Sequence, residues 1–304
     1  MKKILIIGAV TVDYVSKVKV LPKGNEEIKM DDMFARISGF GWNTANLLRI
    51  LKVPFDLFAL VGQGQNADEI RKVANTLEIP LTHNTDDING CTYTIVDSNG
   101  KTTGMVIPGC EYTFPYYDAE DIYFDDYDAI LISDLEMPNE YLDEALQLLE
   151  SFKGEIYYAT STHGMITNDE LKNVLFSYNP ILILKPSEVL ELSNEKDVVD
   201  GARLLSMKTS KQVVVNQKDQ PFTVTSETIS GIEETEEVDL MDESGTEDTF
   251  AAAYMTCKVT GLTEDKSIKF AKFCADLTAS SYETIPPQDS ISKIQEMFTN
   301  SILK

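Results

Sequence analysis

The sequence predicts an α/β fold: a three-layer α/β/α core with a mostly parallel sheet, and a small β-sheet lid attached to it. Short apolar runs rich in β-branched residues alternate with longer amphipathic segments, which is typical of a doubly wound sheet covered by helices. Two other segments alternate polar and apolar residues, as strands with one solvated face do. We therefore expect residues 1–304 to form a single domain whose lid comprises residues 13–36 and 91–107, approximately.

The core strands are expected at the near-continuous apolar runs, which are residues 4–7, 57–60, 129–132, 156–159, 181–184 and 213–215. A strand buried on both faces has no polar side, so such runs indicate the interior of a parallel sheet. Helices are expected between these strands where apolar residues recur at helical spacing, at residues 43–51, 141–151 and 266–281.

The lid is expected at the two segments with alternating patterns. Residues 14–20 read Tyr-Val-Ser-Lys-Val-Lys-Val, and residues 91–107 hold two such runs on either side of Asn99 and Gly100. An Asn-Gly pair between alternating runs favours a tight hairpin turn. We expect both segments to leave the core and form one small sheet over a ligand.

Charge and composition exclude several classes of partner. The chain carries 26 basic and 50 acidic residues, a net charge of −24. Nucleic acids and anionic membranes bind basic surfaces, so neither is expected as a partner. No apolar run reaches the length of a membrane span, and the apolar segment after Lys3 is too short for a signal peptide.

The four cysteines are widely spaced and form no Cys-x-x-Cys pair, and the two histidines lie far from them. A disulfide framework or a zinc site is therefore not expected, and no direct metal ligands are predicted. Free thiols in a cytoplasmic protein are the simplest interpretation.

The pattern of residues 242–253 indicates phosphoryl-transfer chemistry. A glycine turn at Gly245 leads into an acid, Asp248, which opens a helix of small residues. The first turn of a helix offers unpaired backbone N–H groups and the positive end of the helix dipole, which together suit a phosphate. A carboxylate at this point can take the proton from a hydroxyl that attacks the phosphate. Glu247 adds a second negative charge at the same turn.

Further candidates follow predicted strands, where ligands of open α/β sheets bind. Asp13 follows the first strand and is either a ligand contact or a turn residue. In the segment 38–43, Asn43 either caps the next helix or contacts a ligand hydroxyl. Trp42 either stacks on a ligand or packs against the lid. Glu136 follows the strand at 129–132.

The order of these segments resembles the ribokinase-like (PfkB) carbohydrate kinase family over nearly the whole chain. Residues 242–253 look like that family's Asp-Thr-x-Gly-Ala-Gly-Asp-x-Phe signature, and residues 38–43 look like its Gly-Gly-x-Gly-x-Asn signature. The resemblance implies ATP-dependent phosphorylation of a hydroxyl on a small sugar, polyol or nucleoside, with Mg²⁺ bridging the phosphates. It also implies a homodimer that pairs through the lid.

The resemblance assigns roles to individual residues. Asp248 is the implied catalytic base. The implied anion hole consists of Gly245, Thr246 and Glu247. The implied acceptor site consists of Asp13, Gly39, Phe40, Asn43 and Glu136. The implied nucleotide site consists of Ser187, Asn216 and Lys218.

The chain departs from the family pattern mostly on the nucleotide side. Glu247 replaces a glycine and Thr246 an alanine, and Ser187 and Leu190 replace the two key residues of an Asn-x-x-Glu motif. The family's Thr-x-Gly segment corresponds to residues 216–218, Asn-Gln-Lys, which contain no glycine. Its Gly-Asp-Asp segment corresponds to residues 64–66, Gly-Gln-Asn. If the Glu247 side chain faces the site, two unit charges about 4 Å apart repel by about 4 kcal/mol at an effective dielectric constant near 20. Two hypotheses follow: an active kinase, or a catalytically weak or inactive relative that binds a small polar ligand as a sensor or assembly partner.

Overall fold

The computed structural model of the chain describes residues 2–81, 83–113, 123–133, 149, 152–160, 176–218, 220–231 and 239–302. Within these residues the large sheet has the strand order β14-β13-β12-β11-β10-β9-β1-β4. Its strands are β1 (Ile4–Ile7), β4 (Phe55–Phe58), β9 (Ala129–Ser133), β10 (Glu155–Ala159), β11 (Ile181–Leu184), β12 (Val213–Val215), β13 (Phe222–Val224) and β14 (Ile229–Gly231). The pairs from β4 to β12 are parallel, and β13 and β14 complete one edge antiparallel.

The apolar runs form central strands because both of their faces are buried. In β1, Ile4 and Ile6 pack into one hydrophobic cluster, while Leu5 and Ile7 pack into a second cluster on the opposite face of the sheet. The strand predicted at residues 57–60 has the wrong bounds. β4 ends at Phe58 because it pairs with β1 from Phe55 onward, and the chain then enters a separate strand, β5 (Leu60–Gln63).

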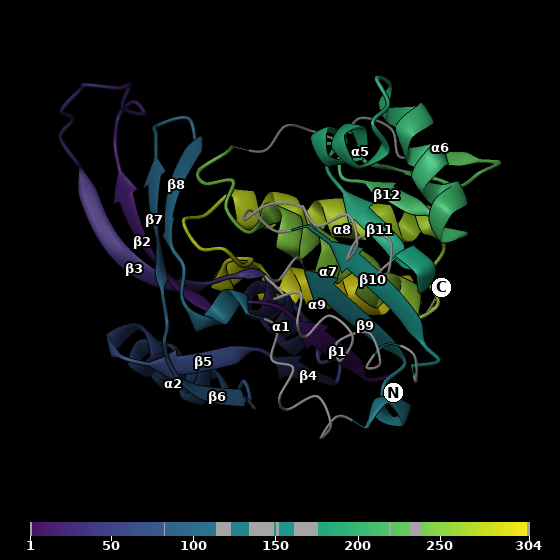
Figure 1. Cartoon of the computed structure of the whole chain (residues 1–304), viewed down its shortest axis with the longest axis horizontal. Coiled ribbons are helices and arrows are strands. Elements are labelled where there is room, and N and C mark those ends of the chain that lie inside the picture. Colours follow the sequence, from purple (N-terminus) through teal and green to yellow (C-terminus); the bar gives the residue numbers. More distant parts are fainter. Residues whose placement is uncertain are drawn as a thin grey trace.

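Helices cover both faces of this sheet (Figure 1). The first cluster includes residues of α1 (Phe40–Leu51), α2 (Gln65–Leu77), α7 (Thr246–Val259), α8 (Glu264–Ala279) and α9 (Ile291–Ile302). The second includes residues of α5 (Pro186–Ser193) and α6 (Val198–Thr209). The helices expected at 43–51 and 266–281 are therefore present as α1 and α8, each beginning two or three residues earlier. Apart from Leu149, residues 141–151 lie outside the described residues.

A second sheet stands beside the core (Figure 1, left) and has the order β3-β2-β7-β8. Its strands are β2 (Thr11–Lys17), β3 (Asp32–Ser38), β7 (Cys91–Val96) and β8 (Thr102–Ile107). Strands from both segments expected to form the lid thus pair in one sheet. The expected turn between β7 and β8 is also present: Gly100 has a φ of 75°, and the Asp97 side chain accepts hydrogen bonds from the Asn99 and Lys101 amides.

The lid sheet touches the turn that precedes α7. The Glu243 amide donates to the Gly100 carbonyl at 3.3 Å, and the Thr102 hydroxyl donates to the Glu243 carboxylate at 3.4 Å. A third small sheet pairs β5 with β6 (His83–Ile88) near the base of the lid. All four cysteines are buried free thiols, as the sequence predicted. Among the helices described, none is long and apolar enough to cross a membrane.

Candidate functional site

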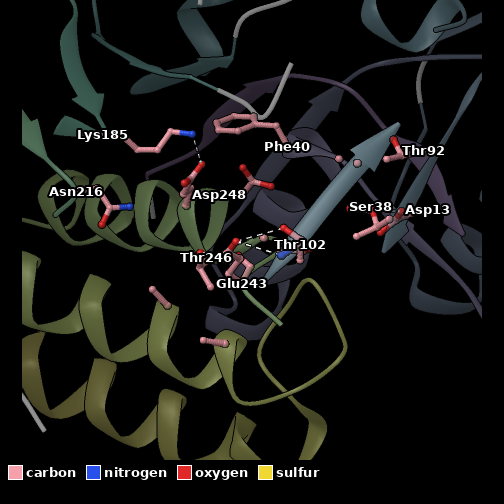
Figure 2. Close-up of a pocket in the computed structure, with 18 of the residues that line it drawn as sticks. Asp13, Ser38, Phe40, Thr92, Thr102, Lys185, Asn216, Glu243, Thr246 and Asp248 are labelled. Atoms are coloured by element: carbon pink, nitrogen blue, oxygen red, sulfur yellow. Dashed lines mark hydrogen bonds and ion pairs between the residues drawn. The ribbon is translucent and has the colours of Figure 1, made fainter. Parts of the chain in front are cut away.

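A cavity of about 900 Å³ lies between the lid and the carboxyl end of the core sheet. The predicted residues that line it are Asp13, Gly39, Phe40, Ser187, Asn216, Lys218, Gly245, Thr246, Glu247 and Asp248. Figure 2 shows Lys185 and Asn216 on one side of Asp248, and Asp13, Ser38 and Thr92 on the other. The fold thus joins the two predicted halves in one space. Glu136 lies outside the described residues.

The turn before α7 has room for glycine alone at position 245. Gly245 has a φ of 75°, and a Cβ there would lie 2.2 Å from the Thr284 carbonyl oxygen. Thr246 and Glu247 already belong to the helix, and neither has a positive φ. Replacement of the family's glycine by Glu247 therefore puts no strain on the backbone. The first-turn residues line the cavity at the positive end of the helix, where backbone amides lack intrahelical partners. The Thr246 amide donates to the Glu243 carbonyl at 3.4 Å.

The Asp248 carboxylate is held by a neighbouring helix. Asn43 of α1 donates its side-chain amide to Asp248 Oδ2 at 2.7 Å. Burial raises the pKa of Asp248 to about 6, the Asn43 hydrogen bond opposes that rise, and the Glu247 charge adds to it. A carboxyl with this pKa is ionised near neutral pH and accepts a proton more readily than an ordinary aspartate.

Asn43 does not cap α1, because the helix begins at Phe40 and Gly39 is its N-terminal capping residue. Its side-chain oxygen accepts a hydrogen bond from the Thr284 hydroxyl at 2.7 Å, and the side chain is buried. Both ends of the Asn43 amide are therefore engaged, and the residue positions Asp248. Trp42 and Phe40 are both buried in the first hydrophobic cluster, and of the two Phe40 also lines the cavity.

Glu247 is paired with a lysine that the sequence argument overlooked. Lys185 follows β11, and its Nζ lies 3.0 Å from Glu247 Oε2 and 3.2 Å from Glu188 Oε1. Burial lowers the pKa of Lys185, but the two carboxylates more than offset that, so the pKa is raised overall. Burial also raises the pKa of Glu247, while Lys185 opposes the rise. One ammonium thus offsets part of the charge of two carboxylates at this turn.

On the acceptor side, Asp13 is bound to a buried arginine. Arg36 of β3 donates its Nε to Asp13 Oδ2 at 2.9 Å and its Nη1 to Asp242 Oδ2 at 2.7 Å. Thr94 donates its hydroxyl to the other Asp13 oxygen at 2.6 Å. Burial raises the pKa of Asp13, and Arg36 and Thr94 oppose that rise. Asp13 is therefore part of an ion network as well as of the cavity wall.

The surface of the lid that faces the cavity carries hydroxyl groups. The residues that contribute them are Thr11, Ser38, Thr92, Thr94 and Thr102. They occupy alternate positions of paired strands, as side chains on one face of a sheet do. This wall suits a polar, uncharged ligand.

Arg36 and Lys185 are residues of the candidate site that sequence reasoning missed. A signal for Lys185 existed, because it directly follows the apolar run at 181–184. Ligands of open α/β sheets bind beyond the carboxyl ends of the strands, and this rule, which was applied to Asp13, holds equally for Lys185. For Arg36 the signal was weaker: a single arginine between Ala35 and Ile37 in a segment expected to be a strand. Lone charges inside apolar strands are almost never buried unless paired.

The pfkB carbohydrate kinase family model matches residues 1–291. The chain belongs to this family. As a member it is a kinase, a phosphotransferase, in agreement with the resemblance drawn from the two signatures. A search of curated protein sequences finds no match.

Solved structures with the same fold include three kinases. A ribokinase from Giardia lamblia has a TM-score of 0.82 at 16% identity, covering 96% of this chain and 99% of its own. An Arabidopsis thaliana ribokinase complexed with ribose and ATP has a TM-score of 0.75 at 17% identity, covering 97% and 99%. A Burkholderia thailandensis nucleoside kinase in complex with inosine has a TM-score of 0.76 at 10% identity, covering 98% and 97%.

Replacing Arg36 by Met should destabilise the protein by about 3–5 kcal/mol, because it leaves the buried Asp13 and Asp242 carboxylates without a cation. The loss should grow as the pH rises, since a lone buried Asp13 is tolerated protonated and becomes costly once it ionises. Urea unfolding at several pH values measures both effects. Arg36→Lys should lose less, and equal stability of Arg36→Met and the wild type would show that the network is not stabilising.

Proposed function

We propose that the protein transfers the γ-phosphoryl group of ATP to a hydroxyl of a small sugar, polyol or nucleoside, with Asp248 as the base. The observation that carries this proposal is a carboxylate of raised pKa in the first turn of α7, inside a cavity shared by both predicted substrate sites. The ribose and inosine in two of the similar structures support this range of acceptors.

In the proposed reaction, Asp248 takes the proton of the acceptor hydroxyl. The acceptor oxygen then bonds to the γ-phosphorus while the bond from that phosphorus to the β,γ-bridging oxygen breaks, and ADP leaves. The backbone N–H groups of Gly245, Thr246 and Glu247 stabilise charge on the transferred phosphoryl group. The lid hydroxyls hold the acceptor, and Gly39 and Phe40 close its pocket.

We assign the nucleotide to the side of the cavity lined by Ser187, Asn216 and Lys218. Among the described residues no cluster of three His, Cys, Asp or Glu side chains could form a metal cage. Mg²⁺ usually binds through substrate phosphates and one or two carboxylates, so it would enter the cavity together with the donor's phosphates. When bound, it would neutralise charge on the phosphates.

The hypothesis of an inactive relative rested on the altered nucleotide-side motifs, of which Glu247 is one. The pairing of Glu247 with Lys185 at 3.0 Å weakens the part of that argument based on charge, and no contact among the described residues of the site favours a sensor over a kinase. We keep the kinase as the proposed function.

A homodimer through the lid is part of the proposal. The face of the lid turned away from the cavity exposes apolar side chains, namely Met33, Tyr93, Met105 and Ile107. Covering such a face with a second copy would remove it from water.

Asp248→Asn should abolish phosphoryl transfer, because the amide cannot accept the proton, while Mg·ATP affinity changes little. Product detection with a panel of sugars and nucleosides, beside calorimetric titration of Mg·ATP, tests this pair of results. Wild-type protein that binds no Mg·ATP at millimolar concentration would sink the kinase proposal. Full turnover by Asp248→Asn would show that another group is the base.

The rate should depend on pH through Asp248. Below a pH of about 6 the carboxyl is protonated and cannot act as the base, so kcat/KM should fall on the acidic side with an apparent pKa near that value. Glu247→Gln removes a charge that raises the pKa of Asp248 and should move this limb to lower pH. A limb that stays in place, measured in parallel profiles, would contradict the assignment.

Met105→Glu and Ile107→Glu should convert the homodimer to a monomer, because each places a charge in the proposed apolar interface. Light scattering at micromolar concentration gives the mass. Met207→Glu is the matched control, because Met207 on α6 is 58% exposed, as is Met105. A wild-type protein of monomer mass would overturn the homodimer.

A further inference from the structure

Lys185 contacts the turn of α7 that is proposed to bind the transferred phosphoryl group. It pairs with Glu247, which is in the first turn of α7 and next to Asp248 in sequence. Its backbone follows β11 and precedes α5, so it reaches the turn from another element (Figure 2). Lys185 lines the same cavity as the first-turn residues that are proposed to receive the transferred phosphoryl group, and its charge opposes the rise that burial causes in the pKa of Asp248.

Glu188 holds Lys185 in place independently of Glu247. The Lys185 amide donates to Glu188 Oε2 at 2.7 Å, and the Lys185 ammonium lies 3.2 Å from Glu188 Oε1. Glu188 is buried, so it is a fixed anchor. Release of Glu247 would leave the ammonium aimed at the cavity, still tied to the start of α5.

The pair between Lys185 and Glu247 is exchangeable. Their side chains are 31% and 34% exposed, and ion pairs with this much contact with water are weak. A lysine offers three donors and forms charge-assisted hydrogen bonds with phosphate oxygens as it does with carboxylates. A phosphate that reaches the turn can therefore displace Glu247 toward solvent.

The other lysines of the cavity wall are placed differently. Among the described residues that line it they are Lys218 and Lys272. Lys272 is buried and bound to both oxygens of Asp276 at 2.7 Å. Lys218 is exposed on the loop after β12. Lys185 is the one whose ammonium contacts a residue of the α7 turn.

We propose that Lys185 is a ligand of the donor's phosphate, and that it exchanges Glu247 for a phosphate oxygen when the donor binds. The inference rests on the proposed kinase function and deepens it. Glu247 then has a definite role: in the free protein it satisfies the ammonium that will later bind phosphate. The competing interpretation is that Lys185 serves only to cancel the charge of Glu247.

A double-mutant cycle separates the two interpretations. Mg·ATP is titrated calorimetrically into wild type, Lys185→Met, Glu247→Gly and the double variant. Removing Glu247 frees the ammonium, so Glu247→Gly should bind more tightly than wild type. If Lys185 binds phosphate, the double variant should bind about tenfold or more weakly than Glu247→Gly, as expected for loss of a contact between charged groups.

Two controls make the result specific. Adenosine, which has no phosphate, should bind all four proteins equally. Lys211→Met removes a surface lysine that pairs with Glu155 at 3.4 Å outside the cavity wall, and it should leave Mg·ATP affinity unchanged. Thermal unfolding confirms that each variant is folded.

Equal Mg·ATP affinity of Glu247→Gly and the double variant would overturn the role of Lys185, while the kinase proposal would stand. Failure of the folded wild type to bind Mg·ATP at millimolar concentration would instead overturn the proposed function, and this inference with it. The two failures are therefore told apart by the wild-type titration alone.

Discussion

The buried guanidinium of Arg36 is the contact on which the arrangement of the site depends. It joins β2 through Asp13, β3 through its own backbone, the turn before α7 through Asp242, and the segment after α8 through the Tyr282 carbonyl. Its side chain is 3% exposed, and those of its partners 4% and 0%. Two carboxylates buried to this degree require a cation beside them. The hydrogen bonds of Arg36 therefore link the base of the lid to the turn that precedes α7 and Asp248.

The same principle operates on the nucleotide side. In the proposed function a chain of net charge −24 receives a polyanionic donor, which requires local positive charge. Lys185 offsets part of the charge of Glu247 and Glu188, while the helix dipole supplies further positive potential. The net charge of a protein governs its long-range attraction for a ligand, whereas the affinity of a binding site depends on charges within a few ångströms of the ligand. Acidity of the whole chain is thus compatible with a phosphate site.

Local patterns were enough to predict the alternating core, the lid hairpin at Asn99 and Gly100, and the position of Asp248. Each depends on residues near one another in sequence. The pairing of Arg36 with Asp242 spans 206 residues, and no local periodicity reports it. The same holds for Asn43, whose partners Asp248 and Thr284 come from the other end of the chain. Its two alternatives, cap or ligand contact, omitted the positioning role that the fold gives it.

The substitutions at the α7 turn are better understood as a compensated set than as erosion. Loss of a glycine alone would place an uncompensated charge at an anion site, and the repulsion would oppose binding. Here the acid at 247 comes with a lysine at 185, and that lysine is anchored in turn by Glu188. The base keeps its hydrogen bond from Asn43 and its raised pKa. Because Glu247 has a cationic partner in the folded protein, its replacement of a glycine does not by itself exclude a phosphate at this turn.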